Sequence, residues 1–202
     1  MNKQDNTDER IKNAQRSNLL YQERIACLVE TMDHLKEMDQ YDISHVFMLV
    51  WQKLNEMMLS FSGGGIFGIK EKKLTFYATQ RMSEPEKHWQ SLSEPSKQQL
   101  LDCLEADAAK DVLFWNYDHN APHLIDKHPE QLSFTISLLC NHPDDEELYM
   151  FLFRDTPKKP LMSDDIQLVK IVSRIMGWHM NYEFTYQLLL YHCKKIFYPR
   201  IK

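Results

Sequence analysis

The segment from residue 118 to residue 128 holds the side chains best suited to metal chemistry in this sequence. They are His119, His123 and His128, beside Asp118 and Asp126. Zn²⁺ and iron accept imidazole nitrogens and carboxylate oxygens as ligands. The spacings of four and five residues bring two rings together only on a helix, and Pro122 and Pro129 interrupt this segment. We therefore expect a solvated loop with no metal.

The four cysteines offer a second kind of chemistry. No two of them form a CxxC pair, and they stand at Cys27, Cys103, Cys140 and Cys193. Dispersed cysteines are typical of reduced thiols in a cytosolic protein. On a strand, Cys140 and His142 would share one face, where the imidazole would polarise the thiol. A buried structural cysteine is favoured, because apolar surroundings raise the pKa of a thiol.

Aromatic residues gather in several segments of the chain, with a few polar residues among them. We predict that eight residues line one pocket on a sheet face: Phe76, Tyr77, Thr79, Trp115, Tyr117, Phe134, Ile136 and Cys140. Aromatic walls with few polar groups suit a small organic ligand. The sequence does not identify that ligand or any cofactor. The alternative, that the aromatic side chains fill the space themselves, stays open.

Composition narrows the class of protein. The chain has 202 residues, of which 43% are hydrophobic and 11% aromatic, enough for a substantial core. The net charge of −5 and the absence of a basic stripe disfavour nucleic acid and anionic membrane surfaces as partners. The polar N-terminus lacks a signal peptide, and the apolar runs are far shorter than a membrane span. We expect a cytoplasmic protein.

Apolar periodicity predicts the elements that position these residues. Helices are expected at 43–61, over 83–109 with helix starts at 83–86 and at 93–95, and from 163 to about 195. Strands are expected at 66–69, 74–79, 132–141 and 147–154. We expect the glycine run at 63–65 to end the first of these helices and form a flexible turn, and residues 111–130 to be irregular.

The N-terminal segment has heptad spacing. Its stripe consists of Ile11, Ala14, Asn18, Tyr21, Ile25, Leu28, Met32 and Leu35. Such a stripe predicts a helix that pairs with a second copy, and a single asparagine such as Asn18 would fix the register of the pair. The alternative is that the stripe packs on its own domain.

The C-terminal helix is apolar on two sides. One stripe holds Leu168, Ile171, Ile175, Trp178 and Tyr182, and the stripe beside it holds Val169, Val172, Met176 and Met180. A helix with two apolar faces needs two partners. We expect its own domain to cover one face and a second subunit to cover the other. The sequence therefore predicts a homodimer.

One stretch of the chain resembles the end of a GAF domain. The strand at 148–153 is followed by a proline-bearing loop and by the helix start at 161–172, similar to the F-S-x-x-D-x-x-L-L pattern of that family. The resemblance covers residues 40–185, preceded by a tail and heptad helix at 1–39 and followed by an extension at 186–202. It implies an α+β fold with a central antiparallel sheet, terminal helices packed on one face and a pocket on the other.

The better-known GAF subfamilies do not match. The Asn-Lys-x-x-Phe-Asp-Glu motif of cyclic-nucleotide-binding members is missing, and the bilin-binding Cys-His pair has no counterpart, because here His192 precedes Cys193. Free methionine sulfoxide reductases have three clustered cysteines, of which only Cys103 and Cys140 have counterparts in the corresponding halves of the chain.

Three functions are compatible with this sequence. The leading hypothesis is a non-catalytic sensory or regulatory domain in signal transduction, which binds a small molecule or an output protein and signals through dimeric terminal helices. The second is a dimerisation scaffold with a collapsed pocket. The third is a small thiol redox enzyme of the free methionine sulfoxide reductase type.

Overall fold

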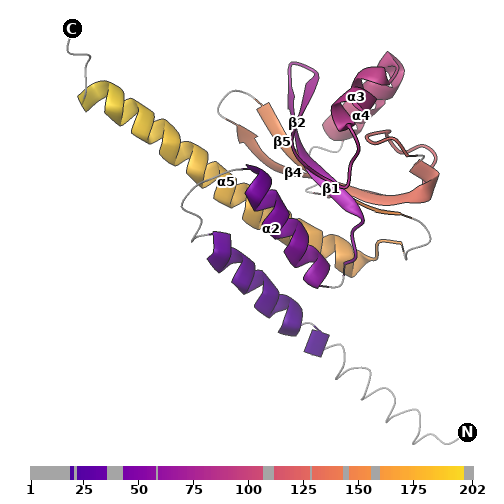
Figure 1. Ribbon diagram of the computed structural model, residues 1–202, viewed down its shortest axis with the longest axis horizontal. Coiled ribbons are helices and arrows are strands. Elements are labelled where there is room, and N and C mark those ends of the chain that lie inside the picture. The colour runs from indigo at the N-terminus through magenta and orange to yellow at the C-terminus, as the bar shows by residue number, and fades with distance from the viewer. Residues whose placement is uncertain are drawn as a thin grey trace, which may run out of the picture.

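Five antiparallel strands form one sheet in the described part of the chain (Figure 1). In this computed structural model the described residues are 19–20, 22–35, 43–57, 59–106, 112–127, 129–142, 146–155 and 160–197, with the backbone alone described at Ala106, Pro129, Asn141, His142 and 182–197. The strand order is β2-β1-β5-β4-β3. The strands are β1 (Gly63–Lys70), β2 (Lys73–Gln80), β3 (Val112–Asn116), β4 (Leu132–His142) and β5 (Glu146–Asp155).

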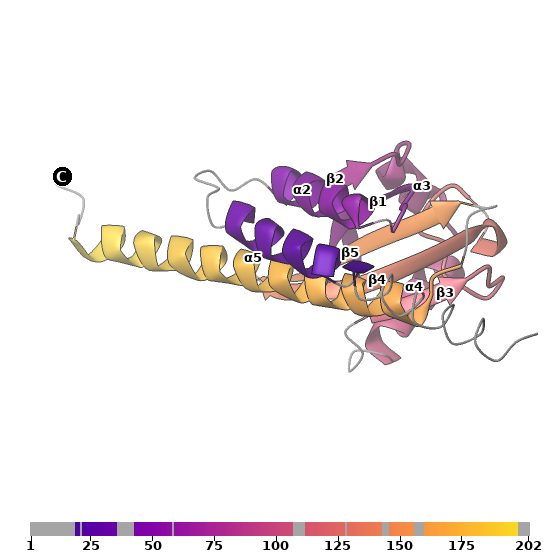
Figure 2. The same cartoon turned by 90° about the horizontal axis from the view of Figure 1, so that it is seen from below.

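Helices cover both faces of this sheet (Figure 2). One face packs against α2 (Ile43–Glu56), α5 (Ser163–Phe197) and the N-terminal helix, residues 22–35. The other face packs against α3 (Pro85–Ser91) and α4 (Glu94–Ala106), and the 3-10 helix η1 (Pro129–Gln131) leads into β4. The predicted α+β fold, with terminal helices on one face of a central antiparallel sheet, is confirmed.

The central strand β5 contributes to both cores. Leu148, Met150 and Leu152 pack under the helices α2 and α5. Tyr149 and Phe151 point to the opposite face, because successive side chains of a strand alternate between faces. A strand buried on both sides reads as a continuous apolar run, and this is the reason that the sequence predicted β5 well.

The glycine run belongs to a strand, so its predicted role as a helix end and turn was wrong. Gly63 to Gly65 are the first residues of β1, and α2 ends at Glu56 rather than at residue 61. None of these glycines has a positive φ. A Cβ on Gly64 would lie 2.2 Å from the carbonyl oxygen of Phe151. Glycine is needed here because neighbouring backbones approach too closely for a side chain.

The turn between β1 and β2 follows the sequence prediction. Lys70 pairs with Lys73, and the two residues between them, Glu71 and Lys72, both have positive φ. Two-residue hairpin loops favour this conformation because it matches the twist of the strands.

Another expectation needs correction. Residues 111–130 were expected to be irregular, but Val112–Asn116 form the edge strand β3, which pairs with β4. The strand is only five residues long and partly exposed, so its alternation is too weak to recognise. The two helix starts expected within 83–109 are those of α3 and α4, and the chain is extended at Leu92 between the two helices.

Two contacts fix the beginning of α5. The buried guanidinium of Arg154 donates to the Asp165 carboxylate at 3.2 Å. The side chain of Asn116 donates to the carbonyl of Leu161 and accepts its N–H, at 3.0 and 2.9 Å. From this start α5 continues to Phe197 without interruption, through the boundary that we placed at residue 185, and extends past the sheet (Figure 1). Within the described residues, no helix combines the length and apolar content needed to cross a membrane.

Candidate functional site

The sheet face beneath α3 and α4 is built from aromatic side chains, which we call the aromatic cluster. Phe67 stacks on Tyr149 with ring centroids 5.4 Å apart, and Phe151 contacts Phe134 at 5.5 Å and Phe153 at 5.7 Å. Helices and loops cover these rings with Trp89, Leu100, Leu104, Leu124 and Ile125. The cluster forms the second hydrophobic core of the protein.

Four of the predicted pocket residues meet in the aromatic cluster. Phe134 and Ile136 are buried in it. Trp115 stacks on Phe134 with centroids 4.9 Å apart, and Phe76 lies 6.1 Å from Phe67. The sequence prediction missed Tyr149, Phe151 and Phe153. Their positions two residues apart on one strand were the signal that would have revealed them.

Tyr117 and Thr79 lie at the ends of their strands. Tyr117 is half-buried just after β3, with φ 55°, and its N–H donates to the carbonyl of Leu132 at 2.8 Å. Thr79 is exposed on the edge strand β2. Neither residue belongs to the buried part of the aromatic cluster.

Tyr77 faces away from the aromatic cluster. A bulge in the pairing of β1 with β2 places Phe67 opposite Phe76 and leaves Tyr77 as the extra residue. Its hydroxyl donates to the buried carboxylate of Glu146 at 2.7 Å. Both groups contact the position of a Cβ on Gly68, which lies on the helix-covered side of the sheet. The expectation that Tyr77 joins the pocket residues is therefore wrong.

A second bulge moves Cys140 out of the cluster. Ile136 and Leu138 point to the aromatic side, and strict alternation would send Cys140 there too. The register shifts between Leu138 and Cys140, so Leu139 and Cys140 both pack on the helix side. A bulge reverses the face of every later residue in a strand. The sheet thus separates Cys140 from Phe134 and Ile136, with which it was grouped.

The position of the cysteines bears on thiol chemistry. Burial raises the pKa of the Cys140 thiol to about 11, so the nucleophilic thiolate is scarce near neutral pH. Cys103 lies half-buried on α4, which covers the opposite face of the sheet. The side chains of His142 and Cys193 are outside the described residues.

The histidine segment contains no assembled metal site in its described part. His119 is exposed and contacts its neighbours Asn120 and Asp118. No group of three potential ligands has metal-binding geometry among the described residues. His128 lies outside them. His88 of α3 lies near His123 and Asp126, and its burial lowers the pKa of its imidazole, an effect that the carboxylate of Asp126 opposes.

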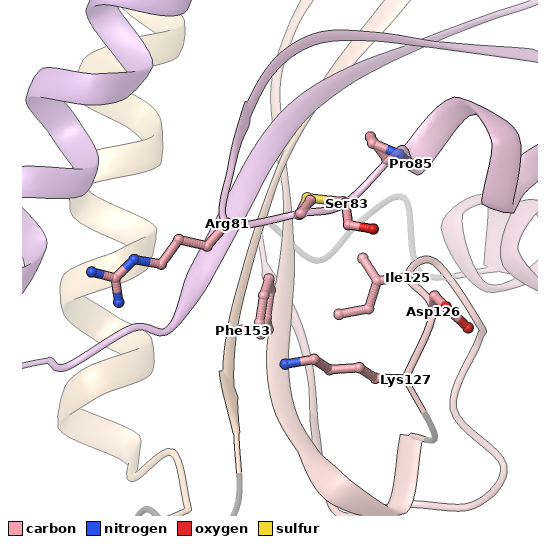
Figure 3. A pocket seen from close by; sticks show the side chains of 8 residues that line it. Arg81, Ser83, Pro85, Ile125, Asp126, Lys127 and Phe153 are labelled. Carbon is pink, nitrogen blue, oxygen red and sulfur yellow. The ribbon is translucent and has the colours of Figure 1, made fainter.

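A small pocket that the sequence did not predict opens beside the aromatic cluster (Figure 3). It has a volume of about 220 Å³ and lies between the β2–α3 connection and residues 125–127. Phe153 and Ile125 form its apolar walls, with the hydroxyl of Ser83 nearby. Lys127 lies over the ring of Phe153 at 5.3 Å and pairs with Asp155 at 2.6 Å. Arg81 points away from the pocket in Figure 3 and lies over the Trp51 ring.

The terminal helices carry apolar side chains that the domain does not bury. On α5, the stripe of Val169, Val172, Met176 and Met180 is buried, whereas Ile171 is 43% and Trp178 is 70% exposed. On the N-terminal helix, Leu28 and Leu35 pack on their own domain, as the alternative interpretation predicted. Ile25 and Val29 are more than half exposed. Ile11, Ala14, Asn18 and Tyr21 lie outside the described residues.

The fold is shared with solved structures of low sequence identity. The GAF domain of a protein assigned as a sensor histidine kinase from Pseudomonas syringae pv. tomato superposes with a TM-score of 0.59 at 13% identity, over 89% of this chain and 99% of that one. The GAF domain of a phosphoenolpyruvate-protein phosphotransferase from Coxiella burnetii superposes with a TM-score of 0.55 at 10% identity, over 80% of this chain and 94% of that one.

A third similar structure comes from a transcription factor. An N-acylhomoserine lactone dependent LuxR family protein from Burkholderia cenocepacia superposes with a TM-score of 0.57 at 12% identity, over 82% of this chain and 98% of that one. No protein-family model and no curated protein matches the sequence. These superpositions show that the chain has a GAF-like fold.

Proposed function

We propose that this chain is a non-catalytic sensory or regulatory domain in signal transduction, which works as a homodimer through its terminal helices. The observation that carries the proposal is the apolar stripe on the outer side of α5, around Ile171 and Trp178. Large exposed apolar side chains on one helix face are typical of protein–protein contacts. Similar folds in a sensor kinase and in a lactone-dependent transcription factor support a sensory role.

The proposed occupant of this stripe is the α5 helix of a second copy. Between the exposed Ile171 and Trp178 lies Ile175, which is partly buried against the domain's own core. The 3-4 spacing of these three residues continues along the sequence through Tyr182, Thr185, Leu189, His192 and Ile196. Alternating spacings of three and four form the seam of a coiled coil. The last core residue of α5 with a described side chain is Met180, and the helix continues from there to Phe197. A projecting helix of this length is marginal in water unless it is paired.

The mass of the protein in solution tests the homodimer. We expect light scattering to give twice the chain mass for the wild type and the single mass for the double variant Ile171→Ser with Trp178→Ser. Phe114→Ser is the matched control, because Phe114 is also half exposed but lies on β3; it should stay dimeric. A wild-type monomer at tens of micromolar would refute the homodimer.

The proposed ligand site is the pocket beside Phe153, with the adjoining aromatic cluster. An apolar wall next to a serine hydroxyl and a lysine suits a small organic molecule. The volume of about 220 Å³ limits a rigidly bound ligand to a small one. An output protein that contacts the terminal helices remains part of the proposal.

The dimerisation scaffold has its own supporting observation. The ring of Phe134 contacts that of Phe151, the ring of Phe67 stacks on Tyr149, and all three phenylalanines are almost wholly buried. In a scaffold the aromatic cluster would serve only as a core. Native mass spectrometry followed by a denaturing run separates the two functions: a dimer that releases a small molecule supports the sensor, and a dimer that releases nothing supports the scaffold.

The thiol redox enzyme receives less support. Its chemistry needs neighbouring thiols of low pKa, whereas Cys103 and Cys140 lie on opposite sides of the sheet and burial raises the pKa of Cys140. Methionine sulfoxide reduction that disappears in both Cys103→Ser and Cys140→Ser would establish this enzyme function and overturn the non-catalytic one.

A further inference from the structure

A row of hydroxyl groups lies on the side of β4 that α5 covers. Ser133, Thr135 and Ser137 alternate with the aromatic-side residues Phe134 and Ile136. Each of the three is fully buried, and none of their hydroxyls has a hydrogen-bond partner among the described residues. Buried polar groups are usually paired, and an unpaired one destabilises the arrangement that buries it. We call these three residues the hydroxyl row.

The helix surface above the hydroxyl row is mainly apolar. Val169, Val172 and Met176 pack in the same core as Met150 and Leu152, the cross-strand neighbours of Ser137 and Thr135. Ser173 is buried there too, and its hydroxyl donates to the carbonyl of Val169 within its own helix at 2.7 Å. Because its hydroxyl bonds within α5, Ser173 does not tie the helix to a polar group of the sheet.

The polar contacts that tie α5 to the sheet lie at the beginning of the helix. Asp165 pairs with Arg154, and Leu161 is held by Asn116. Farther along, α5 stays on the sheet through apolar packing, and Gly177 rests against the carbonyl oxygen of Leu139 without a side chain between them. The unpaired hydroxyls lower the stability of this apolar part of the interface, so they lower the cost of a change in the angle of α5 about its anchored start.

We propose that the hydroxyl row makes the interface between α5 and the sheet a pivot surface, through which a change at the aromatic cluster reaches the C-terminal half of α5. The strand β4 carries Phe134 and Ile136 on one face and the hydroxyl row on the other, so it is the direct physical link between them. This inference rests on the proposed signalling function. The element that would move is α5, and its movement is easy because the hydroxyls beneath it are unpaired.

The test replaces the hydroxyls with groups of similar shape. In the full chain carrying Ser133→Ala, Thr135→Val and Ser137→Ala, we expect the thermal midpoint to rise by about 2–4 °C for each hydroxyl removed. We also expect backbone hydrogen exchange in residues 168–180 to slow by about tenfold. Thr135→Ser keeps a hydroxyl and removes a methyl group, so it should lower the midpoint.

Thr75→Val is the matched control, because Thr75 is exposed on β2 and should leave both measurements unchanged. A triple variant with an unchanged or lower midpoint would overturn the inference, since the row would then be stabilising. A higher midpoint with unchanged exchange in α5 would also overturn it, because the row would not govern the helix. Light scattering measures the dimer separately and so tests the proposed signalling function. The thermal midpoint and the hydrogen exchange test the role of the hydroxyl row, so the two proposals can fail independently.

Discussion

Gly177 of α5 touches the carbonyl of Leu139, the residue that the β4 bulge turns toward the helix. A Cβ at Gly177 would lie 2.0 Å from this oxygen. The bulge and the glycine therefore depend on each other: one pushes a backbone carbonyl toward α5, and the other gives it room.

Gly177→Ala should destabilise the protein. Alanine favours a helix over glycine by about 1 kcal/mol, but the contact with a backbone atom cannot relax by a change of rotamer. We expect the free energy of unfolding to fall by about 1–3 kcal/mol, measured by urea denaturation. Gln167→Ala, at an exposed position of the same helix, should change it by less than about 0.5 kcal/mol.

Asp165→Asn should cost far more stability than Asp155→Asn. Asp165 neutralises the guanidinium of Arg154, whose side chain is only 6% exposed, and the loss of one partner of a buried pair costs about 3–5 kcal/mol. Asp155 pairs with Lys127 at the surface, where such pairs contribute about 0–1 kcal/mol. Chemical denaturation of the two variants makes the comparison. Equal losses would show that the Arg154 pair does not anchor α5.

Lys53→Met should loosen the N-terminal helix. The buried ammonium of Lys53 on α2 contacts Glu56 at 2.9 Å and Glu30 of the N-terminal helix at 3.1 Å. The hydrogen bond with Glu56, followed by that with Glu30, raises the pKa of Lys53, so it is charged at neutral pH. We expect faster hydrogen exchange in residues 22–35 and little change in the sheet. Lys97→Met removes an exposed pair with Glu94 and should leave that exchange unaltered.

Stability should fall in alkali partly because of Cys140. Its pKa is about 11 in the folded protein, above the ordinary value of 9.0 because the thiol is buried, so the folded state keeps its proton more tightly than the unfolded chain. The contribution of the protonated Cys140 thiol to the free energy of unfolding is complete below pH 9. It is lost as the pH rises toward 11, at up to about 1.4 kcal/mol per pH unit. Urea denaturation at pH 8, 9.5 and 11 should give a smaller decline for Cys140→Ala than for the wild type. Parallel declines would place the cause in other groups.

The sequence by itself determined the elements whose local pattern is unambiguous. The apolar run of β5, the hairpin at Glu71 and Lys72, and the helix start around Asp164 and Asp165 follow from periodicity, turn chemistry and the helix dipole. These elements carried the resemblance to GAF domains. The alternation of β4 also placed Phe134 and Ile136 on one face.

Only the tertiary structure decided which residues are neighbours across the sheet. The bulge beside Leu138 sends Cys140 to the helix side, and no local rule signals a bulge in advance. Tyr77 faces the helix side by the ordinary alternation of a strand, one residue after Phe76. The glycines of β1 read as a turn because their need for space comes from β2 and β5, which are distant in sequence. Periodicity is set within a segment, whereas register and close backbone approach are set between segments. For that reason the elements could be predicted and the membership of the site could not.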